Sequence, residues 1–550
     1  MLGRQVFLDS LLAHGVTKMF GNPGTTETPL LDNLGDYPEL EYIFHLHEGV
    51  AVGAANFYAQ ASNTTALVSM HVAPGLGNAI GMIYGAMKNH SPMVVTAGAQ
   101  DTRIRLTDPL LGHDLVSMAA PVTKWSVQVE HADEMAAIMQ RAFKIANEHP
   151  KGPVFVALPI NVMEQETKTA ATTAGRLKNR GLASAETIEE LANLIRNSRK
   201  IGIVAGDDVV TNGAREALVA LSEKIGAGVH LEIVCGQFPF PSKHPHFLGR
   251  VGPDSEAHRD VLGDYDTLLL IGGPFFEDVW HSDSKPFADK VTLIQIELTE
   301  SRLAHNFQLS LGVAADIKDT LECLLERVGN EPIYEERCKA LNESFLASKQ
   351  STESEFAKVK DRSPMTPERA MHELGLALPK DVVISEESIT CAPDVLRNFD
   401  IGGRTPFYAP RGGGIGHGLC GCLGVSIAHR DKQVIAISGD GSAMYSIQGL
   451  WTAAHHKLDI MFVILSNREY RILKHNMNNY RRRFDVQSNG PYVFMDLTNP
   501  ILNFVELAKG MGVPGRKIDS PYDIADVVSE ALSVEGPYLL DLVVEGLESN

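Results

Sequence analysis

Asp440 and Asn467 carry the clearest chemical signal in this chain, because each follows a short apolar run. The run 434–438 is typical of a buried strand that ends in a glycine turn at Asp440, and 460–465 is a second run of this kind. Apolar residues between them recur at helical spacing, which predicts strand, helix, strand. In a right-handed βαβ unit both strands end at the same edge of the sheet, so we expect the carboxylate and the amide to lie side by side.

A carboxylate and an amide oxygen at one sheet edge suit Mg²⁺, which binds few protein oxygens and keeps its other positions for water and phosphate. Gly441 and Ser442 begin the expected helix, so their backbone N–H groups can approach phosphate oxygens. A surface turn is the alternative for Gly-Asp-Gly taken alone. The asparagine after the next strand favours the cation site.

Composition excludes several classes of protein. The formal net charge of −19 leaves no excess of Lys and Arg to neutralise phosphates, so we expect no nucleic-acid partner. No apolar run reaches membrane-spanning length and the N-terminus has no signal-peptide core, so we expect no membrane association. The six scattered cysteines lack zinc-ligand spacing and predict reduced thiols in a cytoplasmic protein.

Apolar runs alternate with helical patterns in three regions of the 550 residues, which predicts an α/β fold of three doubly wound parallel-sheet domains. We expect domains at 1–165, 186–330 and 365–550. A polar Thr/Ala-rich stretch separates the first pair, and a charged, helix-forming connector separates the second.

Three loops of the first region follow strand-like runs: Gly21-Asn-Pro-Gly-Thr-Thr-Glu27, the turn at Glu48, and the turn at His71. Taken alone, Glu48 is most simply a carboxylate at a helix start, favoured by the helix dipole. The glycines from Gly75 to Gly81 are spaced GxGxxxG, which departs from the dinucleotide fingerprint, so we do not expect nicotinamide binding.

Together these motifs resemble the thiamine-diphosphate enzymes of the benzoylformate decarboxylase and acetolactate synthase group, over nearly the whole chain. GNPGTTE, HEGVAVGAA and HVAPGLGNA are similar to the family's pyrimidine-binding domain, and GDG with the later asparagine is similar to its diphosphate-binding motif. The likeness to benzoylformate decarboxylases is the closer one. Ser466 stands where the family usually has the first of two asparagines.

The resemblance implies thiamine diphosphate and Mg²⁺ as cofactors, with the cation held by Asp440, Asn467 and the carbonyl of Glu469. It implies that Glu48 hydrogen-bonds N1′ of the aminopyrimidine. The other implied cofactor contacts are the Gly413 carbonyl, the wedging side chain of Ile415, and Pro23, Ser388, Gly441, Ser442 and Tyr470. Some relatives hold a flavin in the central domain, but no phosphate fingerprint occurs there, so we do not expect FAD.

The implied reaction is decarboxylation of a 2-oxo acid through an enamine, which is then protonated or attacks an aldehyde or acyl-CoA acceptor. By the resemblance Thr25 holds the substrate carboxylate and His71 relays protons. Val279 occupies the position of the family's second relay histidine, and His281, two residues on, is expected to serve instead.

The substrate pocket is expected to include Thr25, Ile472 and Asn476, of which the last two are neither small nor aromatic. They lie in the segment 471–483, where five of thirteen residues are Arg or Lys. This basic segment is either a solvated helix face or a receptor for an anionic substrate tail or coenzyme A phosphates.

Other readings remain open at this point. The enzyme could be a carboligase or lyase of the acetolactate synthase or 2-hydroxyacyl-CoA lyase kind. From other classes, it could be a catalytically silent scaffold or a nucleotide-binding protein, although Glu48, Asp440 and Asn467 together favour an enzyme. The resemblance also implies active sites between subunits, hence a homodimer or homotetramer.

Overall fold

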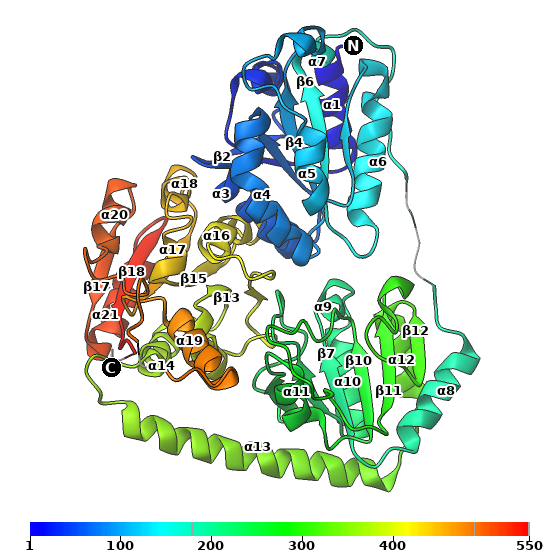
Figure 1. Cartoon of the computed structure of the whole chain (residues 1–550), viewed down its shortest axis with the longest axis vertical. Helices are drawn as coiled ribbons and strands as arrows, with labels where there is room; N and C mark the ends of the chain where they lie inside the picture. Colours follow the sequence, from blue (N-terminus) through cyan, green and yellow to red (C-terminus); the bar gives the residue numbers. More distant parts are fainter. Residues whose placement is uncertain (176, 178–180, 489, 548–550) are drawn as a thin grey trace. The chain divides into compact units, whose positions relative to one another are not determined.

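A computed structural model describes residues 1–175, 177, 181–488 and 490–547. It contains three six-stranded sheets of parallel strands. Figure 1 shows the helices that flank them. The predicted α/β class with three doubly wound sheets is therefore confirmed. By its internal contacts the chain divides into two compact units: Met1–Leu177, Arg362–Val395 and Tyr408–Asn550 form one, and Lys178–Asp361 and Leu396–Phe407 form the other. The exact domain boundaries stay predictions.

The N-terminal sheet has two apolar faces. Its strands, in spatial order, are β2 (Glu41–Phe44), β1 (Lys18–Gly21), β3 (Ala66–Met70), β4 (Met93–Ala99), β6 (Pro153–Pro159) and β5 (Ser126–Gln128). Side chains alternate along each strand. Met19 and Leu67 pack with α1 (Gly3–Ala13) and α6 (Met135–Asn147), whereas Phe20 and Val68 pack with α3 (Glu48–Ser62) and α4 (Val72–Lys88).

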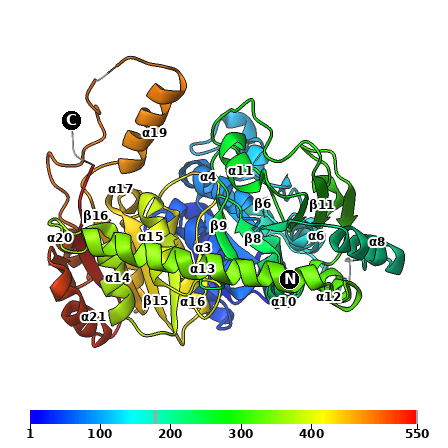
Figure 2. The same ribbon diagram turned by 90° about the horizontal axis from the view of Figure 1, so that it is seen from below.

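The C-terminal sheet repeats the strand order of the N-terminal one. Its strands are β14 (Phe407–Tyr408), β13 (Val382–Glu387), β15 (Gln433–Gly439), β16 (Ile460–Ser466), β18 (Tyr538–Val543) and β17 (Gly515–Ile518). The helices packed on it or beside it are α14 (Pro367–Ala377), α16 (His417–Ala428), α17 (Asp440–Ala443), α18 (Gly449–His455), α20 (Phe504–Gly510) and α21 (Ile524–Leu532). In Figure 2, α19 (Arg471–Arg483, orange) stands apart from α14 and α21.

One apolar core joins these two sheets, because α3 packs directly against α16. A Cβ atom on Gly424 would lie 1.9 Å from the Ala54 carbonyl oxygen, and one on Gly53 would lie 2.1 Å from Cys420 Sγ. The same buried cluster includes Val68 of β3 and Phe462 of β16. The two helices can approach this closely only where each presents a glycine.

The central domain has its own sheet. Its strands are β12 (Leu311–Ala314), β11 (Thr292–Glu297), β10 (Thr267–Ile271), β7 (Ile201–Ala205), β8 (Gly228–Leu231) and β9 (Phe247–Arg250). Its helices are α8 (Ala185–Arg196), α9 (Asp208–Thr211), α10 (Arg215–Ile225), α11 (Ser255–Leu262) and α12 (Ile317–Arg327). The charged connector forms α13 (Pro332–Val359), of which only Tyr334 is buried, as its composition predicts.

The remaining helices are short: α2 (Thr28–Asn33), α5 (Leu115–Ala119), α7 (Ile160–Met163) and α15 (Ala392–Asn398). None of the helices in the described part of the chain is long and apolar enough to cross a membrane. All six cysteines are free thiols.

Candidate functional site

Asp440 meets the turn after β16, as the parallel arrangement requires. β15 and β16 pair in parallel up to Gly439 and Leu465, so Asp440 and Asn467 follow neighbouring strand ends. The Arg468 N–H donates to Asp440 Oδ2 at 2.6 Å, and the Gly441 N–H donates to Oδ1 at 2.8 Å. Each carboxylate oxygen keeps a further lone pair, so Asp440 can still ligate a cation.

The surroundings of Asp440 favour a positive charge. Burial raises its pKa to about 6, the charges of Asp541 and Glu469 add to the rise, and the two N–H bonds oppose it. The Ser466 hydroxyl donates to Asp541 Oδ1, so the serine that replaces the family's asparagine binds a neighbouring strand. A divalent cation would offset this buried negative charge.

Tyr470 and Gly441 lie against each other. A Cβ atom on Gly441 would come within 2.4 Å of Tyr470 Cε1, so only glycine lets the ring lie over this turn. The Asn467 side-chain oxygen accepts from the Glu469 N–H at 3.1 Å, which fixes the turn. The Glu469 carboxylate binds Lys474 and Arg471, so only its backbone carbonyl remains as the expected ligand.

A cavity of about 210 Å³ adjoins Asp440, Ser466 and Asp541. Gly441, Ser442, Ser388 and Tyr470 are not among the residues that line it. It therefore lies on another side of Asp440 than the expected diphosphate contacts. Ser442 and Ser388 are buried, and the Ser388 N–H and hydroxyl both donate to Glu386 Oε1 at 2.5 Å.

Glu48 is the first residue of α3, and its side chain is buried. Asn22 Nδ2 donates to its Oε1 at 3.4 Å, and Asn78 Nδ2 donates to Oε2 at 3.1 Å. A Cβ atom on Gly75 would lie 3.0 Å from Oε1, so α4 approaches the carboxylate closely. The loop after β1 and the first turns of α4, which follow β3, thus contact the carboxylate at the start of α3.

His71 lies beside a second buried carboxylate in the same region. Its Nδ1 is 3.3 Å from Glu27 Oε2 and 3.4 Å from the Thr26 hydroxyl. Glu27 Oε1 accepts from the Gly98 N–H at 2.9 Å, and burial raises the pKa of Glu27. Pro23 and Thr25, on the same loop as Glu27, are exposed.

The glycine loop before α16 carries Gly413 and Ile415. Gly413 has φ +74°, and a Cβ atom there would meet nothing within 4 Å. Glu387 is the last residue of β13. Its buried carboxylate accepts from the Gly416, His417 and Gly418 N–H groups at 3.1, 3.2 and 3.0 Å. Glu387 therefore caps the first turn of α16.

Within one chain this loop and Glu48 lie near different ends of α4. A Cβ atom on Gly412 would touch Tyr84 and Lys88, whereas Gly75 touches Glu48. Gly75 and Tyr84 are separated by about 14 Å along the helix axis. One small ring could not contact the Glu48 carboxylate and the Gly413 carbonyl of the same chain.

The expected substrate residues lie on separate elements. Ile472 and Asn476 are four positions apart on α19, so they share one helix face, and both are half-buried. His281 lies in the central domain between β10 and β11, with an exposed ring whose Nε2 is 3.2 Å from Asp283 Oδ1. Its catalytic role stays a prediction.

Sequence reasoning missed four polar residues that hold these groups: Glu27, Asn22, Asn78 and Glu387. Glu27 and Asn22 stand in a loop that the sequence singled out, but nothing in the pattern assigned them contacts. Asn78 lies in the first turns of α4. The Glu387 carboxylate accepts from N–H groups about thirty residues later in the chain. Only the fold brings them to these positions.

Comparisons with known proteins identify the family. Three family models match: the thiamine pyrophosphate enzyme N-terminal TPP binding domain over residues 1–118, the central domain over 188–324, and the C-terminal TPP binding domain over 395–542. Fold and site thus define a thiamine-diphosphate-dependent enzyme. The chain belongs to the thiamine pyrophosphate enzyme family.

Similar proteins extend over the full length. Benzoylformate decarboxylase of Pseudomonas aeruginosa is 28% identical over 98% of both chains, and a probable acetolactate synthase large subunit of Methanocaldococcus jannaschii is 27% identical over 100% of this chain and 93% of that one. The structure of a thiamine diphosphate-dependent 4-hydroxybenzoylformate decarboxylase from Rhodococcus jostii superposes with a TM-score of 0.86 at 26% identity, covering both chains fully.

The residues present fit the implied cofactors. Asp440, the amide of Asn467 and the Glu469 carbonyl form an oxygen donor set of the kind Mg²⁺ takes when phosphate completes its shell. Gly441 leaves room for a close approach, and the exposed glycines before α16 leave the backbone of that loop accessible.

Proposed function

We propose that this protein decarboxylates a 2-oxo acid with thiamine diphosphate and Mg²⁺ and releases an aldehyde. The similarity to benzoylformate decarboxylases over the whole chain supports this assignment. The side chain of the oxo acid is left open, because Ile472 and Asn476 do not define an aromatic pocket.

The single observation that favours decarboxylation over ligation is the contact between His71 and Glu27. A decarboxylase must return a proton to the carbon that has lost CO₂, whereas a ligase must avoid this step. His71, 3.3 Å from a buried carboxylate, is a proton donor of the required kind. Thr25, two residues before Glu27, is exposed, which supports a role in binding the substrate carboxylate.

Thiamine diphosphate, when bound, supplies a nucleophilic carbon and an electron sink for the pair left by CO₂. Glu48, whose side chain is buried, would hold a proton at N1′ of the pyrimidine. Asp440, Asn467 and the Glu469 carbonyl would hold the cation. Gly413 and Ile415 orient the pyrimidine.

We infer that the active site is completed by a second copy of the chain. Glu48 and the Gly413 loop lie about 14 Å apart along α4 in one chain, which supports pairing of the pyrimidine side of one subunit with the diphosphate side of another. A homodimer is then the smallest active species, and a homotetramer is compatible with it.

The second candidate is a carboligase of the acetolactate synthase kind, because several such large subunits match the chain along most of its length. The two functions differ in product. A panel of aliphatic, aromatic and acidic 2-oxo acids, assayed for CO₂, free aldehyde and ligated product, distinguishes them: excess ligated product would favour the carboligase.

Glu48→Gln tests the assignment. We expect the variant to bind thiamine diphosphate, because the amide leaves the diphosphate side intact. We expect exchange of the cofactor C2 proton to slow by a factor of about 10² or more, because an amide cannot accept the N1′ proton. Exchange is measured by proton NMR in deuterium oxide. Glu39→Gln, an exposed neighbour, is the control, and near-normal exchange in Glu48→Gln would refute the role.

A further inference from the structure

At the carboxyl edge of the central sheet, the position where such sheets usually have a ligand-binding crevice is filled by the chain itself. Strand order reverses between β7 and β10, which is where open α/β sheets commonly bind ligands. Here that position is filled: the Gly206 N–H donates to the Ile271 carbonyl at 3.0 Å, and Asp208 N–H donates to Gly272 at 3.1 Å. A Cβ atom on Gly206 would lie 2.4 Å from the Gly272 oxygen.

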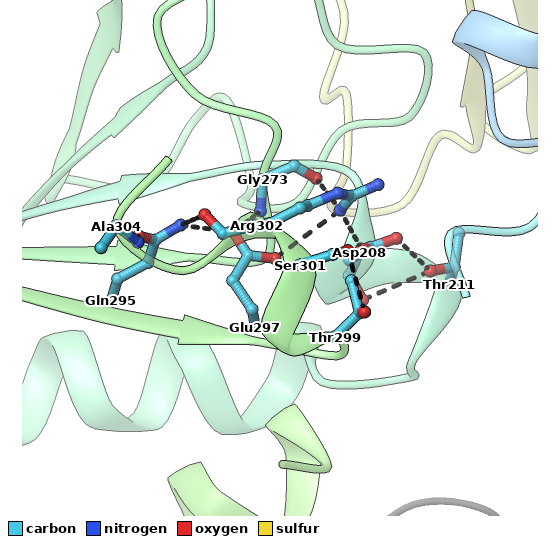
Figure 3. A network of polar contacts seen from close by, with 9 residues as sticks. All are labelled: Asp208, Thr211, Gly273, Gln295, Glu297, Thr299, Ser301, Arg302 and Ala304. Carbon is cyan, nitrogen blue, oxygen red and sulfur yellow. Dashed lines mark hydrogen bonds and ion pairs between the residues drawn. The ribbon is translucent and has the colours of Figure 1, made fainter. Parts of the chain in front are cut away.

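Arg302 closes the remaining gap. Its Nη1 donates to Asp208 Oδ2 at 2.6 Å and to the Gly273 carbonyl at 3.0 Å, as Figure 3 shows. The open space therefore lies one strand further along the sheet, at the carboxyl ends of β10 and β11. A cavity of about 250 Å³ lies there.

Aromatic rings form one wall of this cavity. Phe275, Phe276 and Phe307 line it, with ring centroids 6.3 Å apart for the first pair and 5.5 Å for Phe276 and Phe307. Phe276 has φ 59°, a region that a bulky residue rarely adopts, and its N–H donates to the buried carboxylate of Glu232 at 2.8 Å. The fold thus holds this loop in a strained shape.

Glu297 forms the floor, at the end of β11, and is fully buried. Its Oε1 accepts from the Gly273 N–H at 3.2 Å and from Gln295 Nε2 at 3.0 Å. Its Oε2 is buried and accepts no hydrogen bond from any described residue. The cation nearest to Oε2 is Arg302 at 3.6 Å, and that guanidinium is bound to Asp208.

We propose that this cavity binds a small organic cation, a primary ammonium on a short apolar or aromatic group. The ammonium donates to the Glu297 carboxylate, which lines the cavity, and the apolar group contacts the phenylalanine rings, whose faces attract cations. Of the described side chains that line the cavity, Glu277 and Glu297 are carboxylates, and Arg302 is already paired with Asp208, which disfavours an anion. This site does not depend on the function proposed above.

Benzylammonium is a suitable probe, because it carries both groups and is small enough for the cavity. Calorimetric titration into the full chain compares it with benzyl alcohol and benzoate, which match it in size. We expect benzylammonium to bind at least about tenfold more tightly than the alcohol, because only the ammonium makes a charge-assisted hydrogen bond to the carboxylate. Equal affinities, or tightest binding of benzoate, would overturn the proposal.

Two variants locate the binding. Glu297→Gln should raise the Kd for benzylammonium at least about tenfold, because an amide N–H₂ would face the ammonium. Phe307→Leu should raise it about threefold by removing one ring face while keeping an apolar wall. Glu300→Gln, an exposed carboxylate on the neighbouring turn, should leave it unchanged.

Circular dichroism and melting temperature establish that each variant is folded. If Glu297→Gln does not fold, Phe307→Leu and the three-ligand comparison decide the question. An unchanged Kd in a folded Glu297→Gln protein, or in Phe307→Leu, would overturn the proposal.

Discussion

Glu387 holds the end of the glycine loop before α16 through hydrogen bonds. Its carboxylate accepts three backbone N–H bonds at the start of α16, yet it is buried and lies next to Glu386. Burial raises the pKa of Glu387 to about 8, and the three N–H bonds lower it only in part. The folded protein therefore binds a proton here more tightly than the unfolded chain does.

This raised pKa predicts how stability depends on pH. Between the unfolded pKa near 4.5 and the folded pKa near 8, the native state holds the proton that the unfolded state has lost. The contribution of Glu387 to the free energy of unfolding should then fall as pH rises, by at most about 1.4 kcal/mol per pH unit.

The measurement is the difference in urea-unfolding free energy between wild type and Glu387→Gln at pH 5, 6.5 and 8. Wild type should lose stability relative to the variant as pH rises, because glutamine does not titrate. Glu535→Gln, an exposed carboxylate, should run parallel to wild type. A pH-independent difference for Glu387→Gln would contradict the raised pKa.

The helix pair α3 and α16 sets the distance between the two end sheets. We predict that Gly424→Ala lowers the free energy of unfolding by about 1 to 3 kcal/mol, since a Cβ atom would lie 1.9 Å from the Ala54 carbonyl oxygen and the helices must separate. Gly510→Ala in α20 is the matched control, because nothing lies within 4 Å of its Cβ position. Equal stability of the two variants would show that the helix contact is not tight.

The basic helix α19 divides into two parts. Near its start, Lys474 donates to Asp496 Oδ1 at 2.7 Å and Arg471 pairs with Glu469 at 3.2 Å, so these cations hold the segment to the site turn. Near its end, Arg481 donates to the Gly490 carbonyl at 2.6 Å, and its guanidinium lies 5.5 Å from the centre of the Tyr492 ring. Only the later part can take up a substrate charge without breaking a buried ion pair.

We predict that replacing Arg481, Arg482 and Arg483 together by Gln raises KM for a 2-oxo acid with an anionic tail by about tenfold, or roughly 1.4 kcal/mol. A neutral-tailed oxo acid should change little. Lys509→Gln with Arg516→Gln, two exposed cations elsewhere in this domain, is the control. Equal effects on both substrates would mean that the arginines are structural.

At the scale of the whole molecule, the separation of Glu48 from the Gly413 loop predicts shared active sites. Glu48→Ala and Asp440→Ala should each be inactive alone. Subunits of both, dissociated and reassociated together, should recover about a quarter of wild-type activity, because half of the dimers then contain one intact site.

The activity of the mixed sample is measured beside its mass by light scattering. Reassociating Glu48→Ala with Glu48→Gln should restore nothing, since no dimer of these two chains has an intact pyrimidine side. Failure of the first mixture to recover activity, although mixed dimers form, would place the complete site within one chain.

Much of the architecture could be predicted from sequence because it depends on the spacing of apolar residues and on where the strands end. Apolar runs, glycine turns and helical spacing were enough for three doubly wound sheets. The approach of Asp440 to the turn at Arg468 follows from two parallel strands ending at one edge, and needs no knowledge of the rest of the fold. The sequence does not reveal that the two end sheets have the same strand order, because strand order depends on which strands pair and not on the spacing of apolar residues.

Only the tertiary structure decided which side chains meet across loops. Glu387 reaches N–H groups about thirty residues away, and Glu27 meets His71 from another strand. Glu297 accepts from the Gly273 N–H through one oxygen, and its other oxygen accepts no hydrogen bond from a described residue. A carboxylate has the same place in the sequence pattern whether it caps a helix, orients a histidine or faces a cavity. Its role depends on the donors that packing brings to it, and packing is fixed by contacts between elements far apart in sequence.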